Sequence, residues 1–208
     1  MRLHASLRSS IAIAIAACVA VTVTACAGGD APADAEQIAE SARSLDIVPE
    51  LVYTTDVDGY DLAVQSVGST GSSGMSASWF SEARGGILTI RTDFGEVTAE
   101  TCAEMPMFES GEAAVTCDED DDGLWHRTAG DVHEYFAVRG DVLIRVSGRG
   151  ASAEDLRAAA QAVHVPSAAE LELLFSDALK RLQGQPVERG DLPEHGDGAP
   201  IDPSGPGG

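Results

Sequence analysis

From residue 51 onward, apolar and polar side chains alternate with a period of two, the pattern of β-strands that have one buried face. Glycine-containing dipeptides typical of tight turns interrupt this alternation repeatedly. The strands predicted in this way cover residues 51–57, 60–64, 75–83, 87–92, 113–117, 124–129, 132–138 and 142–147. Successive strands joined by tight turns pair antiparallel, so we expect a series of hairpins.

The first two connections between the predicted strands are a tight turn and a longer loop. Asp58-Gly59 predicts a two-residue turn, and the resulting register places Asp56 opposite Asp61. Like charges directly opposite each other destabilise a strand pair, so either a cation lies between them or the register is shifted. The next connection, residues 68–74, is rich in glycine and serine and is expected to be a flexible loop. It lacks the Gly-Lys-Ser/Thr ending of a phosphate-binding loop.

The later hairpins contain the residues that are expected to face the core. The second hairpin turns at Gly85-Gly86, and its alternation gives one buried face. Residues 97–111 between the hairpins are irregular. The residues predicted to face the core are Trp79, Leu88, Ile90, Trp125, Phe136 and Val138.

Helical periodicity follows the last strand. Ser152 begins the first predicted helix, and Pro166 ends it. Ser167 and Glu170 have the spacing of a capping box at the start of a second helix with a clear apolar stripe. Hairpins followed by helices predict an α+β fold, a twisted antiparallel sheet of about seven strands with C-terminal helices packed on one face.

Composition divides the chain into four parts. Residues 1–25 have a positive start and an apolar run of about a dozen residues, typical of a signal peptide and too short for a membrane helix of roughly 20. Residues 26–48 are expected to be a flexible tether, with a loose helical turn or two from Ala35 to Ser44. The α+β domain covers residues 49–183. Residues 184–208 are rich in proline, glycine and acidic residues and are expected to be disordered.

The signal ends in Val23-Thr24-Ala25-Cys26. Small residues directly before a cysteine resemble the lipobox of bacterial lipoproteins, in which the cysteine receives a diacylglycerol and becomes the first residue after cleavage. The resemblance implies that Cys26 carries at least two acyl chains, which anchor a protein stably where one chain does not. Ordinary cleavage nearby, with Cys26 as a spare thiol, is the alternative.

Other features of the chain agree with a bacterial origin. A single lysine occurs beside twelve arginines, amid abundant alanine and glycine, as expected from GC-rich coding. Residues 135–147 and 156–160 resemble the strand–strand–helix ending of several secreted Gram-positive domains. Together with the lipobox, the chain resembles membrane-anchored actinobacterial lipoproteins of uncharacterised function.

Charge excludes some classes of partner. The chain left after removal of residues 1–25 has 183 residues, with 11 basic and 34 acidic side chains and a net charge of −23. Such a balance argues against nucleic-acid binding, which needs a basic surface. It also argues against lying flat on anionic lipid, so the domain is expected to stand off the bilayer as a soluble monomer.

Two cysteines remain in the expected domain. Cys18 leaves with the signal and Cys26 carries lipid, so Cys102 and Cys117 are predicted to form a disulfide in an oxidising compartment. Closing this loop stabilises the fold by about 3 kcal/mol in the chain-entropy model. A redox or metal role is the alternative, although there is no Cys-x-x-Cys spacing and no close histidine.

An acidic run at residues 118–122 is the most conspicuous candidate metal site. Asp118, Asp120 and Asp122, followed by Gly123, match the first half of an EF-hand calcium loop. The match ends at Ala129, where a bidentate glutamate is required. A solvated acidic turn is therefore the favoured interpretation, and weak calcium binding is the alternative.

Two further patterns have competing interpretations. His126 and His133 are predicted to lie diagonally on one face of a hairpin that turns at Gly130-Asp131, beside Tyr135. They would hold zinc if a carboxylate joined them, but ordinary polar-face histidines are favoured. Arg139-Gly140-Asp141 spells an adhesion tripeptide and also suits a tight turn, which is favoured.

These observations favour a non-enzymatic binding or accessory lipoprotein on the outer face of the cytoplasmic membrane, with no cofactor and a protein or envelope partner. Its acidic face and residues 68–74 and 97–111 are the expected contact surfaces, because loops on a rigid scaffold carry function. One alternative is a calcium- or metal-responsive module that uses the acidic run. Another is an envelope enzyme without a recognisable motif.

Overall fold

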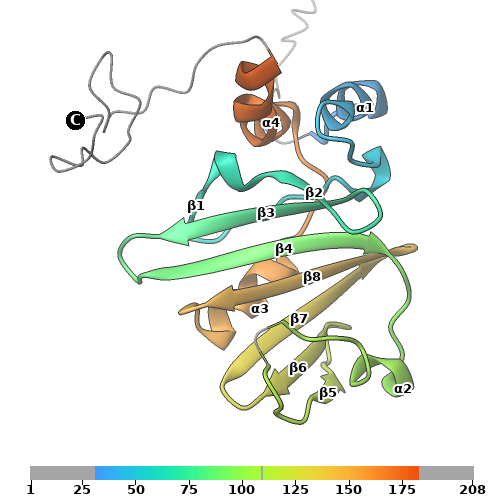
Figure 1. Ribbon diagram of the computed structural model, residues 1–208, viewed down its shortest axis with the longest axis vertical. Helices are drawn as coiled ribbons and strands as arrows, with labels where there is room; N and C mark the ends of the chain where they lie inside the picture. Colours follow the sequence, from blue (N-terminus) through green and yellow to red (C-terminus); the bar gives the residue numbers. More distant parts are fainter. Residues whose placement is uncertain (1–30, 109, 183–208) are drawn as a thin grey trace, which may run out of the picture.

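The computed structural model describes residues 31–108 and 110–182, which form an eight-stranded sheet with helices (Figure 1). The strands are β1 (Asp61–Leu62), β2 (Gly68–Thr70), β3 (Gly74–Ser81), β4 (Gly86–Phe94), β5 (Thr116–Glu119), β6 (Trp125–Ala129), β7 (Val132–Arg139) and β8 (Val142–Arg149). Their order is β1-β3-β4-β8-β7-β6-β5, with β2 also paired to β3, and all of these pairs are antiparallel. This confirms the predicted α+β fold.

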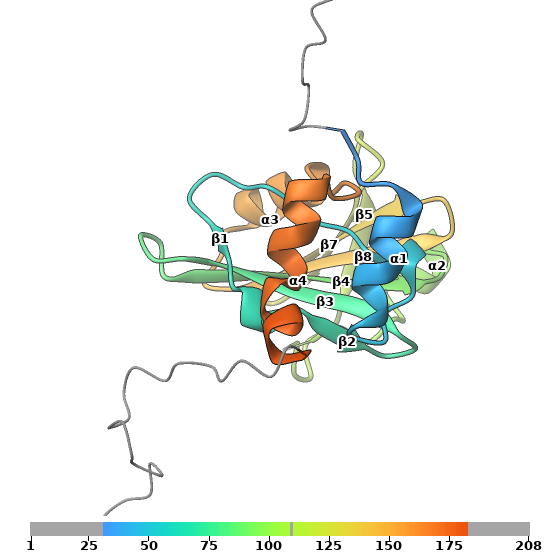
Figure 2. The same cartoon turned by 90° about the horizontal axis from the view of Figure 1, so that it is seen from above.

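The helices lie before, within and after the strands in sequence. They are α1 (Ala35–Arg43), α2 (Ala99–Cys102), α3 (Ala153–Gln161) and α4 (Ala168–Leu182), with short 3-10 turns η1 (Pro49–Leu51) and η2 (Val64–Ser66). Helix α3 contacts β7 and β8, whereas α4 contacts α1 and η2. Figures 1 and 2 show α1 and α4 side by side near the β1–β3 end of the sheet.

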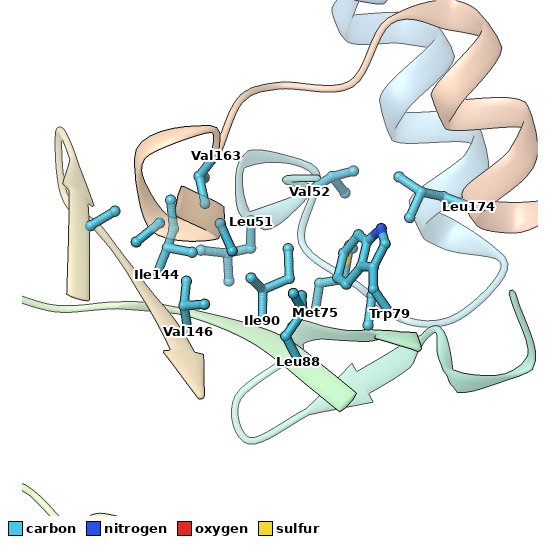
Figure 3. Close-up of a cluster of buried hydrophobic side chains, with 14 of the residues drawn as sticks. Leu51, Val52, Met75, Trp79, Leu88, Ile90, Ile144, Val146, Val163 and Leu174 are labelled. Atoms are coloured by element: carbon cyan, nitrogen blue, oxygen red, sulfur yellow. The ribbon is translucent and has the colours of Figure 1, made fainter. Parts of the chain in front are cut away.

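The main hydrophobic core lies between these helices and one face of the sheet (Figure 3). Inward side chains of β3, β4 and β8, such as Trp79, Ile90 and Ile144, meet Leu156 of α3 and Leu174 of α4 in one cluster. The core face predicted for the second hairpin is confirmed, because Trp79, Leu88 and Ile90 are all buried.

A second, smaller cluster lies on the opposite face of the sheet. The β4–β5 connection (residues 95–115, of which residue 109 is not described) contains α2. Its Cys102 packs against Phe136 and Leu143, with Trp125 and Val138 partly buried around them. Trp125, Phe136 and Val138 were expected to join the main core, and they instead form this separate cluster because their strand positions point to the other face.

Both predicted helix starts of the C-terminal part are confirmed. The Ser152 hydroxyl accepts a hydrogen bond from the backbone N–H of Asp155 at 3.0 Å. At the start of α4, the backbone N–H of Ser167 donates to Oε2 of Glu170 at 2.8 Å, and the backbone N–H of Glu170 donates to the Ser167 hydroxyl at 3.3 Å. This reciprocal pair is the predicted capping box.

The predicted first hairpin is wrong. The Asp58-Gly59 turn is present, with the N–H of Tyr60 donating to the carbonyl of Val57 at 3.0 Å, but residues 51–57 do not form a strand beside it. Asp61 pairs with Phe80 of β3 instead, so Asp56 and Asp61 are not paired in the sheet. Consecutive residues of this segment are buried instead of alternate ones, including Leu51 and Val52 and then Thr54 and Thr55. The segment packs against the helices, where the Thr55 hydroxyl donates to the carbonyl of Ala159 in α3 at 2.7 Å.

Two segments expected to be flexible contain regular structure. Within residues 68–74, β2 pairs with the start of β3, and a side chain at Gly74 would put its Cβ 2.0 Å from the carbonyl oxygen of Thr92. Glycine is therefore required there for close strand approach, not for flexibility. Within the expected tether of residues 26–48, α1 is capped by Asp34 and buries Ile38 and Ala42. The predicted signal peptide, Cys26 and the tail at 184–208 lie outside the described residues.

Candidate functional site

The acidic run forms the turn between β5 and β6 and binds to α3. Oδ1 of Asp120 accepts hydrogen bonds from the backbone N–H groups of Asp122 and Leu124, both at 3.0 Å. Oδ2 of Asp120 accepts from Nε of Arg157 at 3.1 Å, and Oδ2 of Asp122 accepts from Nε2 of Gln161 at 2.8 Å. Arg157 also pairs with Asp122. These carboxylates therefore fasten the β5–β6 turn to α3.

The structure does not bring the three predicted calcium ligands together. Asp118 lies on β5, opposite His126, while Asp120 and Asp122 share Arg157. Burial works to raise the pKa of Asp120, but its hydrogen bonds from Leu124, Asp122 and Arg157 prevail and hold that pKa below its ordinary value. Within residues 31–108 and 110–182, no group of three or more histidine, cysteine, aspartate or glutamate side chains is placed to hold a metal ion.

The two histidines lie diagonally on the β6–β7 hairpin, as predicted. Nε2 of His126 and Nδ1 of His133 are 3.0 Å apart, which is hydrogen-bond distance. The His126 ring is stacked between those of His133 and Tyr135, with ring centroids 5.3 Å and 4.3 Å apart. Burial and the neighbouring His133 lower the pKa of His126, so the His126 ring is predominantly neutral at pH 7.

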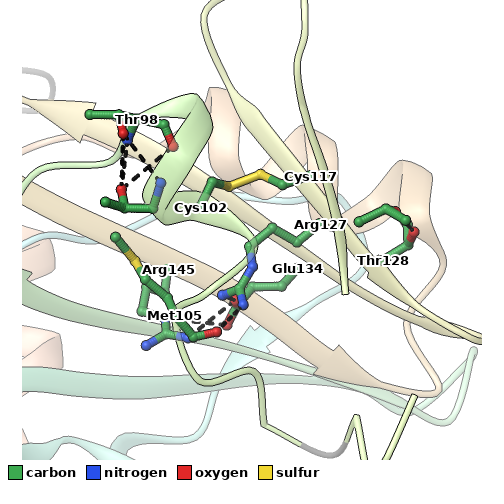
Figure 4. Close-up of a disulfide and its surroundings, with 10 residues drawn as sticks. Thr98, Cys102, Met105, Cys117, Arg127, Thr128, Glu134 and Arg145 are labelled. Carbon is green, nitrogen blue, oxygen red and sulfur yellow. Dashed lines mark hydrogen bonds and ion pairs between the residues drawn. A yellow bond between two sulfur atoms is a disulfide. The ribbon is translucent and has the colours of Figure 1, made fainter. Parts of the chain in front are cut away.

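The disulfide lies above a buried ionic network on the face opposite the main core (Figure 4). Cys102 of α2 and Cys117 of β5 are joined, with their Cα atoms 6.0 Å apart. Below them, fully buried Arg127 donates to Glu134 at 2.7 Å, and Arg145 is paired with the same carboxylate at 3.2 Å.

Both arginines also hold the β4–β5 connection. Arg127 donates to the carbonyl of Met105, and Arg145 donates to that of Pro106. The ionic network therefore adds to the small apolar cluster beneath this connection. The sequence contained a signal for it, because the predicted turn at Gly130-Asp131 places Arg127 directly opposite Glu134.

An apolar hollow of about 440 Å³ lies beside α1, and we call it the α1 pocket. Four separate segments contribute to it, from α1 to the connection between α3 and α4. Its apolar lining consists of Ala35, Ile38, Ala39, Pro49, Val52, Val142 and Val165. Its volume lies within the range of small-molecule sites, which are mostly apolar with a few polar groups.

The polar groups of the α1 pocket come from one turn, from η1 and from the residues directly after η1. Arg139-Gly140-Asp141 is the tight turn between β7 and β8, as favoured from the sequence, with Gly140 at φ 64°. Arg139 and Asp141 line the pocket together with Tyr53 and Glu50. Burial and the nearby Asp141 raise the pKa of Tyr53, against the opposing effect of Arg139. Tyr53 is therefore a neutral phenol that can both donate and accept a hydrogen bond at this pocket.

A larger, polar hollow of about 930 Å³ lies between the Asp58-Gly59 turn and α3. It is lined by several carboxylates and by Arg84, whose guanidinium pairs with Asp155 at 2.7 Å. The hydroxyl of Tyr60 donates to the same carboxylate at 3.2 Å. The contact of Arg84 links α3 to the β3–β4 turn. Arg84, Tyr60 and Asp155 therefore already have structural partners in this hollow.

Comparison with known proteins gives no relative for this chain. No protein-family model, no curated protein and no solved structure matches it. Among the described residues, no helix has the length and apolar character needed to cross a membrane.

Proposed function

We propose that this chain is a lipid-anchored, non-enzymatic binding lipoprotein on the outer face of the cytoplasmic membrane, and that the α1 pocket holds its ligand. The observation that carries the proposal is the pocket itself, an apolar hollow of about 440 Å³ with Tyr53, Arg139 and Asp141 among its lining. Apolar volume with a few polar groups is typical of a ligand site, and the lipobox ending in Cys26 supplies the location.

The position of α1 supports a ligand drawn from the membrane. Pro32 forms a bridge with Ser167 just before this helix, so residues 26–31 alone separate Cys26 from the folded domain. A chain of six residues spans at most about 20 Å. A tether running to residue 48 would have allowed more than twice that distance. A lipidated Cys26 would therefore hold the α1 pocket within reach of the headgroup layer.

The lining of the pocket defines the chemistry of the ligand. Its apolar side chains favour a short hydrocarbon portion, whereas Arg139 and Asp141 offer a donor and an acceptor of opposite charge. A small amphiphile with an uncharged or zwitterionic polar end matches both. The negative charge of the domain disfavours nucleic acid, as the sequence already indicated.

Binding of the neutral fluorescent probe N-phenyl-1-naphthylamine tests the pocket. Ala39 lines the pocket from a half-buried position on α1, so Ala39→Phe fills the space and should weaken binding at least about tenfold. Ala169→Phe, at an exposed position of α4, is the matched control and should bind like the parent protein. Thermal melting of both variants verifies folding. Equal binding by parent and Ala39→Phe proteins, both folded, would remove the pocket from the proposal.

Cell fractionation tests the anchor separately. A Cys26→Ser chain should leave the membrane fraction, because the thioether site is lost. Retention of Cys26→Ser in the membrane at the level of the parent chain would contradict lipid anchoring, whatever the result for the pocket.

A further inference from the structure

Among the described residues, the sheet face opposite α1, α3 and α4 is only partly covered. The β4–β5 connection crosses β6 and β7, where the backbone carbonyls of Met105 and Pro106 accept hydrogen bonds from Arg127 and Arg145. Over β3, β4 and β8, the same face presents half-buried hydroxyl groups beside exposed apolar side chains. Among the latter, Phe80 is 44% exposed and Ile87 is 40% exposed. This half of the face therefore remains open to a ligand.

A groove of about 280 Å³ lies on this open half, and we call it the Arg91 groove. Thr89 and Ser147 are a cross-strand pair in β4 and β8, which places two hydroxyl groups side by side. A second guanidinium, that of Arg149, also lines the groove. The other side chains that define it are Ile87, Arg91, Phe108 and Val132.

Arg91 differs in its partners from the other buried or half-buried arginines of the sheet and α3. Arg127 and Arg145 share Glu134, and Arg157 is paired with two aspartates. Arg91 is half-buried, and its guanidinium lies 4.6 Å from the ring centroid of Phe108. Its hydrogen bond within the described residues is a long one of 3.4 Å, from Nη1 to the Ser147 hydroxyl. No carboxylate in that part of the chain is paired with it.

This arrangement leaves hydrogen-bond donors directed at the groove. A guanidinium has five N–H donors, and Arg91 uses one of them in its bond to Ser147. The Ser147 hydroxyl accepts that bond and retains its own hydrogen. Asp93, the next residue on this face of β4, accepts from the backbone N–H of Phe94 at 2.9 Å. The strongly negative net charge does not prevent local anion binding, because charges farther than about 8 Å are largely screened at physiological salt.

We propose that the Arg91 groove is a second binding site, for a small carboxylic acid with an apolar chain. The carboxylate of the ligand accepts hydrogen bonds from Arg91 and from the Ser147 hydroxyl, and the hydrocarbon chain of the ligand lies against Ile87 and Phe108. A planar guanidinium matches a carboxylate through two parallel bonds, and it is also stabilised by stacking on an aromatic ring. The small volume selects a short ligand. This site lies on the opposite face from the α1 pocket and does not depend on it.

Titration of the full chain with hexanoate, followed by amide shifts in nitrogen-15 NMR spectra, tests this site. Shifts should concentrate in β4 and β8 around Arg91, and hexanamide and hexylamine should give much weaker binding. Arg91→Met keeps the length of the side chain and should weaken hexanoate binding at least about tenfold, whereas Arg91→Lys should give an intermediate loss. Arg43→Met removes the same charge at the end of α1 and should bind hexanoate like the parent.

Several outcomes would overturn the proposal. Hexanoate shifts spread evenly over the surface, or equal hexanoate binding by Arg91→Met and Arg43→Met, would exclude the groove. Tighter binding of a short peptide through its free C-terminal carboxylate than of hexanoate would show that the occupant is a protein terminus. Testing each variant with the ligand of the other site distinguishes the two sites. Ala39→Phe should leave hexanoate binding unchanged, and Arg91→Met should leave binding of the neutral probe unchanged.

Discussion

The two faces of the sheet are stabilised in different ways. On the helix side, aliphatic and aromatic side chains of three helices cover β3, β4, β7 and β8 in one continuous cluster. On the other side, the β4–β5 connection contributes few apolar residues and is held by the disulfide and by Glu134 between two arginines. The comparison teaches that an irregular segment with few apolar residues can be held on a sheet face by a disulfide and by buried ion pairs. It also leaves the neighbouring half of that face open.

The largest expected effect comes from removing the charge of Glu134. Glu134→Gln leaves Arg127 buried without its counter-ion, and we expect the free energy of unfolding to fall by about 3–5 kcal/mol. Urea denaturation measures this loss. Ile144→Val, in the core of the other face, should cost only about 0.5–1.5 kcal/mol. If Glu134→Gln cost no more than Ile144→Val, the ionic network would not be a main support of its face.

A double variant sharpens the same point. Replacing both members of the fully buried pair, as in Arg127→Met with Glu134→Leu, leaves only Arg145 without its counter-ion, and Arg145 is partly exposed to solvent. The double variant should therefore recover most of the stability lost in Glu134→Gln. A double variant as unstable as the single one would show that the geometry of the network, and not its charge balance, holds the connection.

The next effect concerns the disulfide. Replacing Cys102 and Cys117 by alanine should lower the free energy of unfolding by about 3 kcal/mol, because the loop in the unfolded chain is no longer closed. Hydrogen exchange should become faster in β5 and β6 and remain slow in β3 and β4. A uniform acceleration over the whole sheet would contradict the separate support of the two faces.

A smaller effect is expected at the contact between the β5–β6 turn and α3. Arg157→Met should lower the melting temperature only slightly, because the pair with Asp120 and Asp122 is partly exposed to solvent. Since these carboxylates already bind Arg157, millimolar calcium should leave the melting temperature of the parent protein unchanged. A clear rise with calcium, abolished in Asp120→Asn, would restore the calcium-responsive alternative.

The smallest effects are those of the histidines on pH dependence. Burial and His133 lower the pKa of His126, so its contribution to stability is present above its unfolded pKa of about 6.5 and is lost as pH falls through the lower folded value. For His164, burial opposes protonation, but the Ala162 carbonyl and Glu170 prevail and raise the pKa. Its contribution is full below about 6.5 and is lost as pH rises through the higher folded value. NMR titration should show His126 protonating at lower pH than His164, and the reverse order would contradict both environments.

The parts of the fold predicted correctly are those defined by local patterns. Tight turns and period-two alternation identified β3, β4 and the hairpins from β6 to β8, and the capping residues Ser152 and Ser167 located α3 and α4. The first hairpin failed because residues 51–57 pack against distant partners. Thr54 forms its isolated bridge with His164, more than a hundred positions away in the chain.

The candidate binding sites were less accessible to sequence reasoning. The α1 pocket is assembled from four segments, and no local pattern in the chain predicts such a hollow. Helix α1 was located, at residues 35–44, but its order was underestimated because Ile38 and Ala42 are its only buried apolar residues. The capping-box spacing of Asp34 and Gln37 could have indicated an ordered helix start. The Arg91 groove depends on what is absent around Arg91, namely a carboxylate partner among the described residues, and only the three-dimensional arrangement reveals this.

The intact mass of the full chain, expressed in a bacterium that lipidates exported proteins and extracted from its membranes in mild detergent, tests the central claim most directly. The account predicts a chain that begins at Cys26 and carries a diacylglycerol on its sulfur. A chain that retains residues 1–25, or one that begins elsewhere and bears no acyl group, would contradict it.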